Sequence, residues 1–84
     1  MPIGSWSPPV CVFAGKAGNK RWVVGDAALA ARIMLQEWPA HAPKGPANLK
    51  ARKVLLRCLQ GKCEPEQARQ AFVAAAEEAN ILDH

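Results

Sequence analysis

Seven prolines determine where helices can begin and end in this chain of 84 residues. Inside a helix a proline removes a backbone hydrogen bond and clashes with the preceding turn, but at the first helical position it is well tolerated. Pro46 and Pro65 therefore predict helix starts, and Pro39 predicts the end of an earlier helix. On this basis we expect three helices, over residues 27–37, 46–60 and 65–80.

The apolar residues of these predicted helices recur at helical spacing. Asp26 is a suitable N-cap for the first helix, and Gly61 suits the position just after the second. The third helix carries mostly alanines on its apolar side, with Phe72 as the one large anchor. The apolar stripe of the second helix consists of Ala47, Ala51, Val54, Leu55 and Cys58.

Two short apolar runs before the first helix predict a β-hairpin. Residues 10–13 and 21–24 are rich in β-branched and aromatic side chains, and residues 16–19 between them suit a turn. Because a lone hairpin is marginally stable in water, we expect it to lie against the helices, where a strand from elsewhere could extend it. Residues 1–9 contain three prolines and are expected to be an extended N-terminal segment with little structure of its own.

A chain of this length has room for one hydrophobic core. The expected fold is a single compact α+β domain over residues 10–84, in which a short β-hairpin is followed by three helices (ββααα). The expected core consists of Val10, Val12, Phe13, Trp22, Val24, Leu29, Ile33, Trp38, Ala51, Val54, Leu55, Cys58, Ala68, Phe72, Ala75 and Ala79.

The cysteines and the absence of long apolar runs favour a cytoplasmic protein without a membrane segment. No run approaches the roughly 20 apolar residues that span a bilayer, and no secretory signal is recognisable. Cys11, Cys58 and Cys63 are an odd number, so we expect no disulfide framework. Their spacing does not suit a metal site, and no cofactor is expected. Cys11 and Cys58 are interpreted as small buried hydrophobes.

The net charge of +4 is distributed unevenly. Residues 44–62 hold six bases and no acid, whereas the rest of the chain holds five bases and seven acids. Lys50, Lys53 and Arg57 fall along one edge of the second helix, where they could contact phosphates of a nucleic acid. A solvated helix face is the alternative, and no aromatic residue interleaves with these bases to stack on single strands.

Leu49 and Leu56 lie on the side of the second helix opposite its apolar stripe. A helix with apolar residues on both sides is either sandwiched within its domain or joined to a partner chain. We weigh burial inside this domain and a homodimer contact equally.

Residues suited to catalysis are scarce. Both serines lie in the N-terminal segment, and His41 lies in the proline-rich loop. Glu77 and Glu78 are adjacent, so they point about 100° apart on a helix and cannot act on one atom as an acid–base pair. Cys63 is the best candidate for a reactive thiol, because a helix start follows it, although no base is evident beside it. We therefore predict no catalytic residues.

Several short motifs stand out by their order and spacing. They are Pro9-Val10, Trp22-Val23, Trp38-Pro39, Cys58-Leu59-x-Gly61 and the alanine-rich run from Ala68 to Ala79, which is the most specific of them. Together, over about residues 9–82, they resemble the small bacterial proteins grouped as domain of unknown function 982. The resemblance implies a stand-alone α+β cytoplasmic protein and carries no activity, catalytic residue or cofactor.

The function that these observations favour is that of a small non-enzymatic protein that acts through macromolecular contacts and self-associates. Weak nucleic-acid binding through residues 44–62 is the alternative. A pocket near His41 or Cys63 for a small molecule is a third and weaker hypothesis.

Overall fold

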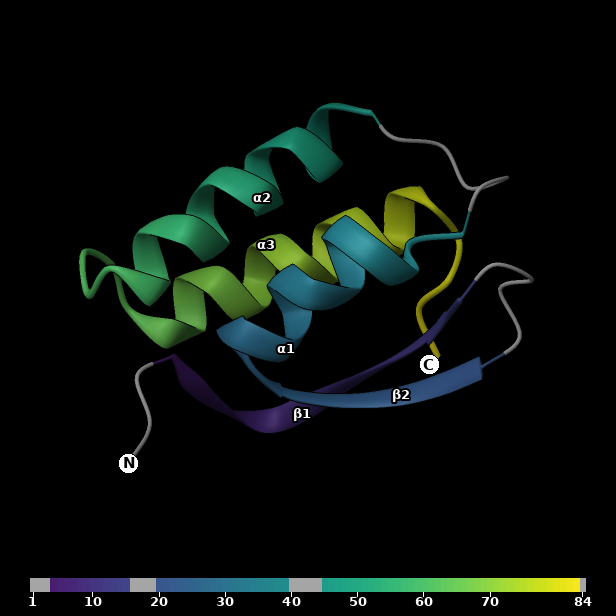
Figure 1. Cartoon of the computed structure of the whole chain (residues 1–84), viewed down its shortest axis with the longest axis horizontal. Helices are drawn as coiled ribbons and strands as arrows, with labels where there is room; N and C mark the ends of the chain where they lie inside the picture. The colour runs from purple at the N-terminus through teal and green to yellow at the C-terminus, as the bar shows by residue number, and fades with distance from the viewer. Residues whose placement is uncertain (1–3, 16–19, 40–44, 84) are drawn as a thin grey trace.

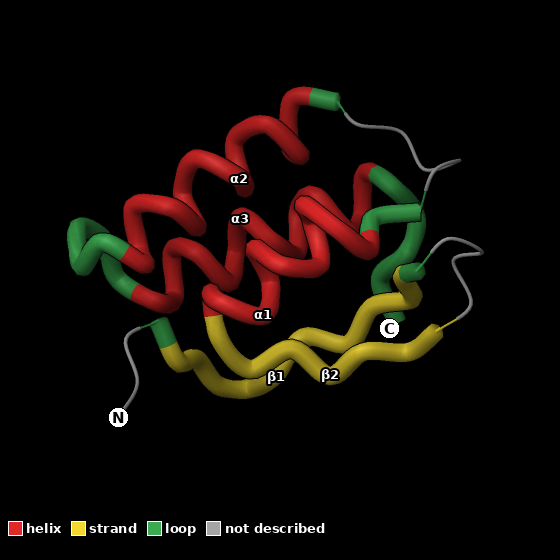
Figure 2. The backbone as a smooth tube through the Cα atoms, viewed as in Figure 1, coloured by secondary structure: helices red, strands yellow, loops and turns green. Residues whose placement is uncertain are grey.

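A two-stranded sheet and a layer of helices make up the fold (Figures 1 and 2). The computed structural model describes residues 4–15, 20–39 and 45–83. The helices cover one face of the sheet (Figure 1), so the expected α+β class and the order ββααα are confirmed. The elements in chain order are β1 (Ser5–Ala14), β2 (Lys20–Asp26), α1 (Ala27–Arg32), the π-helical turn η1 (Ile33–Glu37), α2 (Pro46–Leu59) and α3 (Pro65–Glu78).

The helix boundaries follow the prolines and caps that the sequence contains. Both α2 and α3 begin at a proline, as predicted. The side chain of Asp26 accepts a hydrogen bond from the backbone N–H of Leu29 at 2.7 Å, which confirms the N-cap of α1. Gly61 follows α2 with a φ of +74°, a left-handed conformation that favours glycine. The first helix continues to Glu37, but its last turn is π-helical, which the spacing did not predict.

The first strand begins at Ser5 rather than at Val10, so most of the segment expected to have little structure belongs to the sheet. Trp6 is buried, and its indole N–H donates to the carbonyl oxygen of Val24 at 2.9 Å. The pairing with β2 shifts register between Ser5 and Val10. This irregularity coincides with two prolines, which cannot donate backbone hydrogen bonds to a ladder.

A short C-terminal segment, residues 81–83, extends the sheet along the other edge of β1. Val12 and Leu82 form an antiparallel bridge. The N–H of Phe13 donates to the carbonyl of Ile81 at 2.8 Å, and the N–H of Asp83 donates to that of Cys11 at 2.9 Å. Segment 81–83 thus pairs with the hairpin through one isolated bridge and does not form a full third strand.

The core lies between the helices and one face of the sheet. Most of its expected members are buried, but Phe13, Trp22, Leu29 and Val54 are only half-buried. Cys11 was also expected to be buried; it is half-buried, and its sulfur accepts a hydrogen bond from Arg21. Its side chain therefore lies near the sheet surface. The buried apolar residues that are absent from the expected core are Trp6, Ala14, Ala27, Ala30, Met34, Ala76 and Ile81.

Within residues 4–15, 20–39 and 45–83, no helix is both long enough and apolar enough to cross a membrane.

Candidate interaction site

The packing of α2 leaves a groove along each of its two flanks. Ala51, Leu55 and Cys58 face the core, where α2 packs against α3 and α1. One flank of this buried stripe faces α1 and η1, and the other faces α3. The leucines and cations that the sequence marks on this helix are divided between the two flanks.

The groove between α2 and the α1–η1 helix, named here the leucine groove, is mainly apolar and has a volume of about 400 Å³. Leu35 is 68% exposed, Leu49 54% and Leu56 58%. Few other large apolar side chains of the described residues are as accessible. A contiguous apolar surface of this kind is typical of an interaction site. The groove is lined by Ala31, Met34, Leu35, Leu49, Arg52, Lys53, Leu55, Leu56 and Leu59.

Leu49 and Leu56 are thus not sandwiched inside the domain. Both side chains are more than half exposed, so the alternative of internal burial is wrong. The contact with a second copy of the chain stays a prediction.

The charged residues that line the leucine groove have one sign. Arg52 and Lys53 are both exposed, and no acidic residue in the described part of the chain lines the groove. The ion pairs found among the described residues join Arg21 to Asp83 and Arg69 to Glu66, so neither cation of the groove takes part in one.

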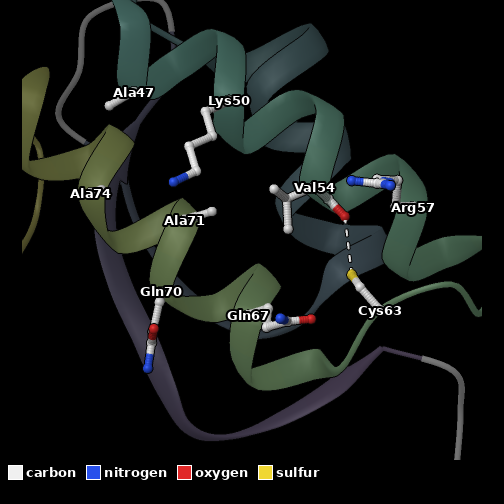
Figure 3. A pocket seen from close by; sticks show the side chains of 9 residues that line it. All are labelled: Ala47, Lys50, Val54, Arg57, Cys63, Gln67, Gln70, Ala71 and Ala74. Carbon is white, nitrogen blue, oxygen red and sulfur yellow. Dashed lines mark hydrogen bonds between the residues drawn. The ribbon is translucent and has the colours of Figure 1, made fainter.

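The groove on the other flank, named here the α2–α3 groove, contains two of the three cations predicted to contact phosphate. Lys50 and Arg57 line it from α2, whereas Lys53 lines the leucine groove (Figure 3). The three cations on this edge of α2 therefore belong to two different grooves. The groove has a volume of about 400 Å³. Its other lining residues are Ala47, Val54, Cys63, Gln67, Gln70, Ala71 and Ala74.

Cys63 lies in the α2–α3 groove without a catalytic partner. Its thiol donates to the carbonyl oxygen of Val54 at 3.5 Å (Figure 3), and among the described residues no histidine or carboxylate lines the groove. Burial raises the pKa of the Cys58 thiol, and the neighbouring Cys63 thiol raises this pKa further. Cys58 is therefore a buried, protonated thiol, as its interpretation as a small hydrophobe requires.

Glu78 positions the start of α2, a role that the sequence analysis missed. One carboxylate oxygen accepts from the N–H of Gly45 at 2.9 Å and from that of Asn48 at 3.3 Å, and the other accepts from Ala47 at 3.1 Å. The sequence did contain one signal for this role. A glycine at the N-cap has no side chain to accept hydrogen bonds from the first turn, so Gly45 indicates that another residue must accept them.

The structure describes no metal site. None of its described parts brings together three histidine, cysteine or acidic side chains that could hold an ion. His41, Lys44 and His84 lie outside the described residues, and so does the predicted turn at residues 16–19.

Comparison with protein families assigns the chain to a family. The model of a family described as "Protein of unknown function (DUF982)" matches residues 9–83, nearly the whole chain. No curated protein matches the chain, and no solved structure does.

Proposed function

Because the chain belongs to the DUF982 family of proteins of unknown function, whose description names no activity, we propose a function from the structure. The protein is a non-enzymatic protein that acts through macromolecular contacts, and its leucine groove docks a second copy of the chain. The observation that carries this proposal is the clustering of exposed Leu35, Leu49 and Leu56 around one groove.

A second copy fits because ridge and groove lie on the same surface. The exposed Leu49 and Leu56 form a ridge on α2, directly beside the hollow over Met34 and Ala31. A two-fold axis would place the ridge of each copy in the groove of the other, as a self-complementary interface requires. Burial of the exposed half of one leucine side chain contributes about 1 kcal/mol to the free energy of dimerisation. Each leucine occurs twice in a two-fold symmetric interface, so its contribution is doubled.

The like charges beside the groove predict how salt affects this dimer. Arg52 and Lys53 of the two copies would come close together, and their repulsion would weaken association at low ionic strength. Added salt screens this repulsion, so the dimer dissociation constant is expected to fall as salt rises. Sedimentation equilibrium over a series of sodium chloride concentrations measures this. If the groove instead bound an acidic partner, salt would weaken the binding.

Introduction of negative charge into the ridge is expected to abolish the dimer. In Leu49→Glu/Leu56→Glu, burial of two carboxylates would cost more than the leucines contributed, while the fold remains because both positions are exposed. Light scattering coupled to size exclusion measures the mass, and circular dichroism checks the fold.

Val23→Glu is the matched control for this experiment, since Val23 is 53% exposed but lies on β2, away from the leucine groove. This variant is expected to stay dimeric. A monomeric wild type at high micromolar concentration, or a folded double variant that stays dimeric, would contradict the proposal.

The non-enzymatic part of the proposal has its support in the described grooves. Cys63 lines the α2–α3 groove, and its thiol bonds to a backbone carbonyl rather than to a catalytic base. We also propose a cytoplasmic location, which the free state of Cys11, Cys58 and Cys63 supports, because exported proteins commonly pair their cysteines.

Weak nucleic-acid binding is the second candidate, and the exposure of Lys50, Lys53 and Arg57 on one helix favours it. Phosphate contacts would make such binding strongly dependent on salt. Fluorescence anisotropy with duplex and single-stranded oligonucleotides at several salt concentrations tests it. Affinity that is undetectable at low salt, or that does not change with salt, would exclude it.

A further inference from the structure

We propose that the α2–α3 groove binds a small organic anion, in which a phosphate or carboxylate is carried on a compact apolar body. This site is independent of the proposed dimer contact, because the two grooves lie on opposite flanks of α2. The groove combines cations on one wall, an amide donor on the other and an apolar floor.

The cations of the α2 wall are available to a ligand. Lys50 and Arg57 are both exposed, and the ion pairs found in the described residues involve neither of them. They are seven residues apart, which places them on the same edge of the helix, about 10 Å apart along its axis. Figure 3 shows the Lys50 side chain extending into the groove from α2. Two cations can therefore reach a ligand that lies between them.

The α3 wall adds a donor rather than an acid. The side-chain oxygen of Gln67 accepts from the N–H of Glu64 at 3.1 Å in the capping box of α3, which leaves the amide N–H groups of Gln67 free of that bond. The amide of Gln70 donates to Glu66 at 3.3 Å, and Arg69 pairs with the same carboxylate. Glu66 is thus already engaged, and it does not line the groove.

The floor of the groove determines the kind of anion. Val54, Ala71 and Ala74 present small apolar surfaces where a larger side chain would fill the space. A volume of about 400 Å³ lies in the range of small-molecule sites, roughly 300–1,000 Å³. Inorganic phosphate alone would leave this floor in water. A nucleic acid would engage Lys53 equally, but Lys53 lines the other groove.

The thiol of Cys63 provides a local readout of occupancy. Cys63 lines the groove and is half-buried, whereas Cys11 is half-buried on the sheet and Cys58 is buried. Alkylation by iodoacetamide, followed by peptide mass spectrometry, measures the rate at Cys63 with Cys11 as the internal reference. The probes are phenyl phosphate, phthalate, inorganic phosphate and the neutral benzyl alcohol.

The expected result is selective protection of Cys63. At a probe concentration about ten times its dissociation constant, phenyl phosphate or phthalate should slow alkylation of Cys63 about tenfold and leave Cys11 unchanged. Benzyl alcohol should protect little, because it has no anionic group. Comparison of phenyl phosphate with phthalate shows whether phosphate or carboxylate is preferred. No protection by either anion in the wild type, or equal slowing at Cys63 and Cys11, would overturn the proposal.

Two variants test whether the anion binds in this groove or is only attracted to the positive charge of α2 in general. Lys50→Gln/Arg57→Gln is expected to weaken binding of the anion about a hundredfold or more, since each of the two lost charged hydrogen bonds accounts for roughly a factor of ten. Lys53→Gln is the matched control, an exposed cation of the same helix outside the groove, and should retain protection. Equal loss in both variants would show non-specific attraction and would overturn the site. The dimer mass, measured separately by light scattering, tests the leucine groove alone.

Discussion

Replacement of Trp6 by alanine is expected to lower the free energy of unfolding by about 3–5 kcal/mol. The indole is buried, donates to the carbonyl of Val24 and lies 6.3 Å from the ring of Phe72, measured between centroids. Its removal would leave a cavity under β1 and an acceptor without its partner. Because small domains are stable by about 5–15 kcal/mol in total, urea denaturation followed by circular dichroism should show a clearly lower midpoint.

Two further variants separate the causes of this effect. Trp6→Phe keeps an aromatic ring but loses the hydrogen bond to Val24, so a loss of about 1 kcal/mol is expected from that bond. Trp22→Ala removes a half-buried indole whose N–H has no hydrogen-bond partner, and it should cost less than Trp6→Ala. If Trp6→Ala unfolds at the same urea concentration as the wild type, the Trp6 side chain does not contribute to the core.

Replacement of Glu78 by alanine is expected to cost about 1–3 kcal/mol, because three backbone N–H groups at the start of α2 would lose their acceptor. The carboxylate also lies at the positive end of the α2 dipole, which adds to its contribution. The same urea measurement applies. Relative to the wild type, hydrogen exchange in Glu78→Ala should become faster in the first turn of α2 and stay unchanged in the first turn of α3.

Glu77 is the matched control, since it is adjacent, exposed and in none of the hydrogen bonds described above. Glu77→Ala should change the free energy of unfolding by less than about 0.5 kcal/mol. Glu78→Gln keeps one good acceptor but loses the charge, so its free energy of unfolding should lie between those of the wild type and Glu78→Ala. Equal effects of Glu77→Ala and Glu78→Ala would show that the cap does not stabilise α2.

Much of the fold could be predicted because its signals are local. Pro46 and Pro65 begin helices whatever the rest of the chain does, and Asp26 bonds within its own helix turn. Trp6 could not be placed in this way. It stands beside prolines that indicate an irregular segment, and its burial depends on Phe72, which is far away in the sequence.

The candidate site could be predicted only in part, because local spacing shows the face of a helix but not the elements that pack beside it. Helical spacing placed Leu49 and Leu56 away from the buried stripe, but only the packing of α2 against α3 and α1, which leaves both side chains outside the core, decided that they are exposed. Spacing also put Lys50, Lys53 and Arg57 on one edge, yet the grooves to which they belong depend on where α1 and α3 pack. The role of Glu78 depends on a contact between two helices that adjacency along α3 does not show.

The order of synthesis gives the pairing of β1 a consequence for the nascent chain. The hairpin partner β2 emerges from the ribosome soon after β1, but segment 81–83 emerges only after all the helices. Until then one edge of β1 lacks the bonds that Ile81 and Asp83 later make. Open strand edges are the places where other chains pair and aggregate. This edge of β1 is therefore covered only once segment 81–83 has left the ribosome, and a chain that ends before Ile81 would keep the edge open.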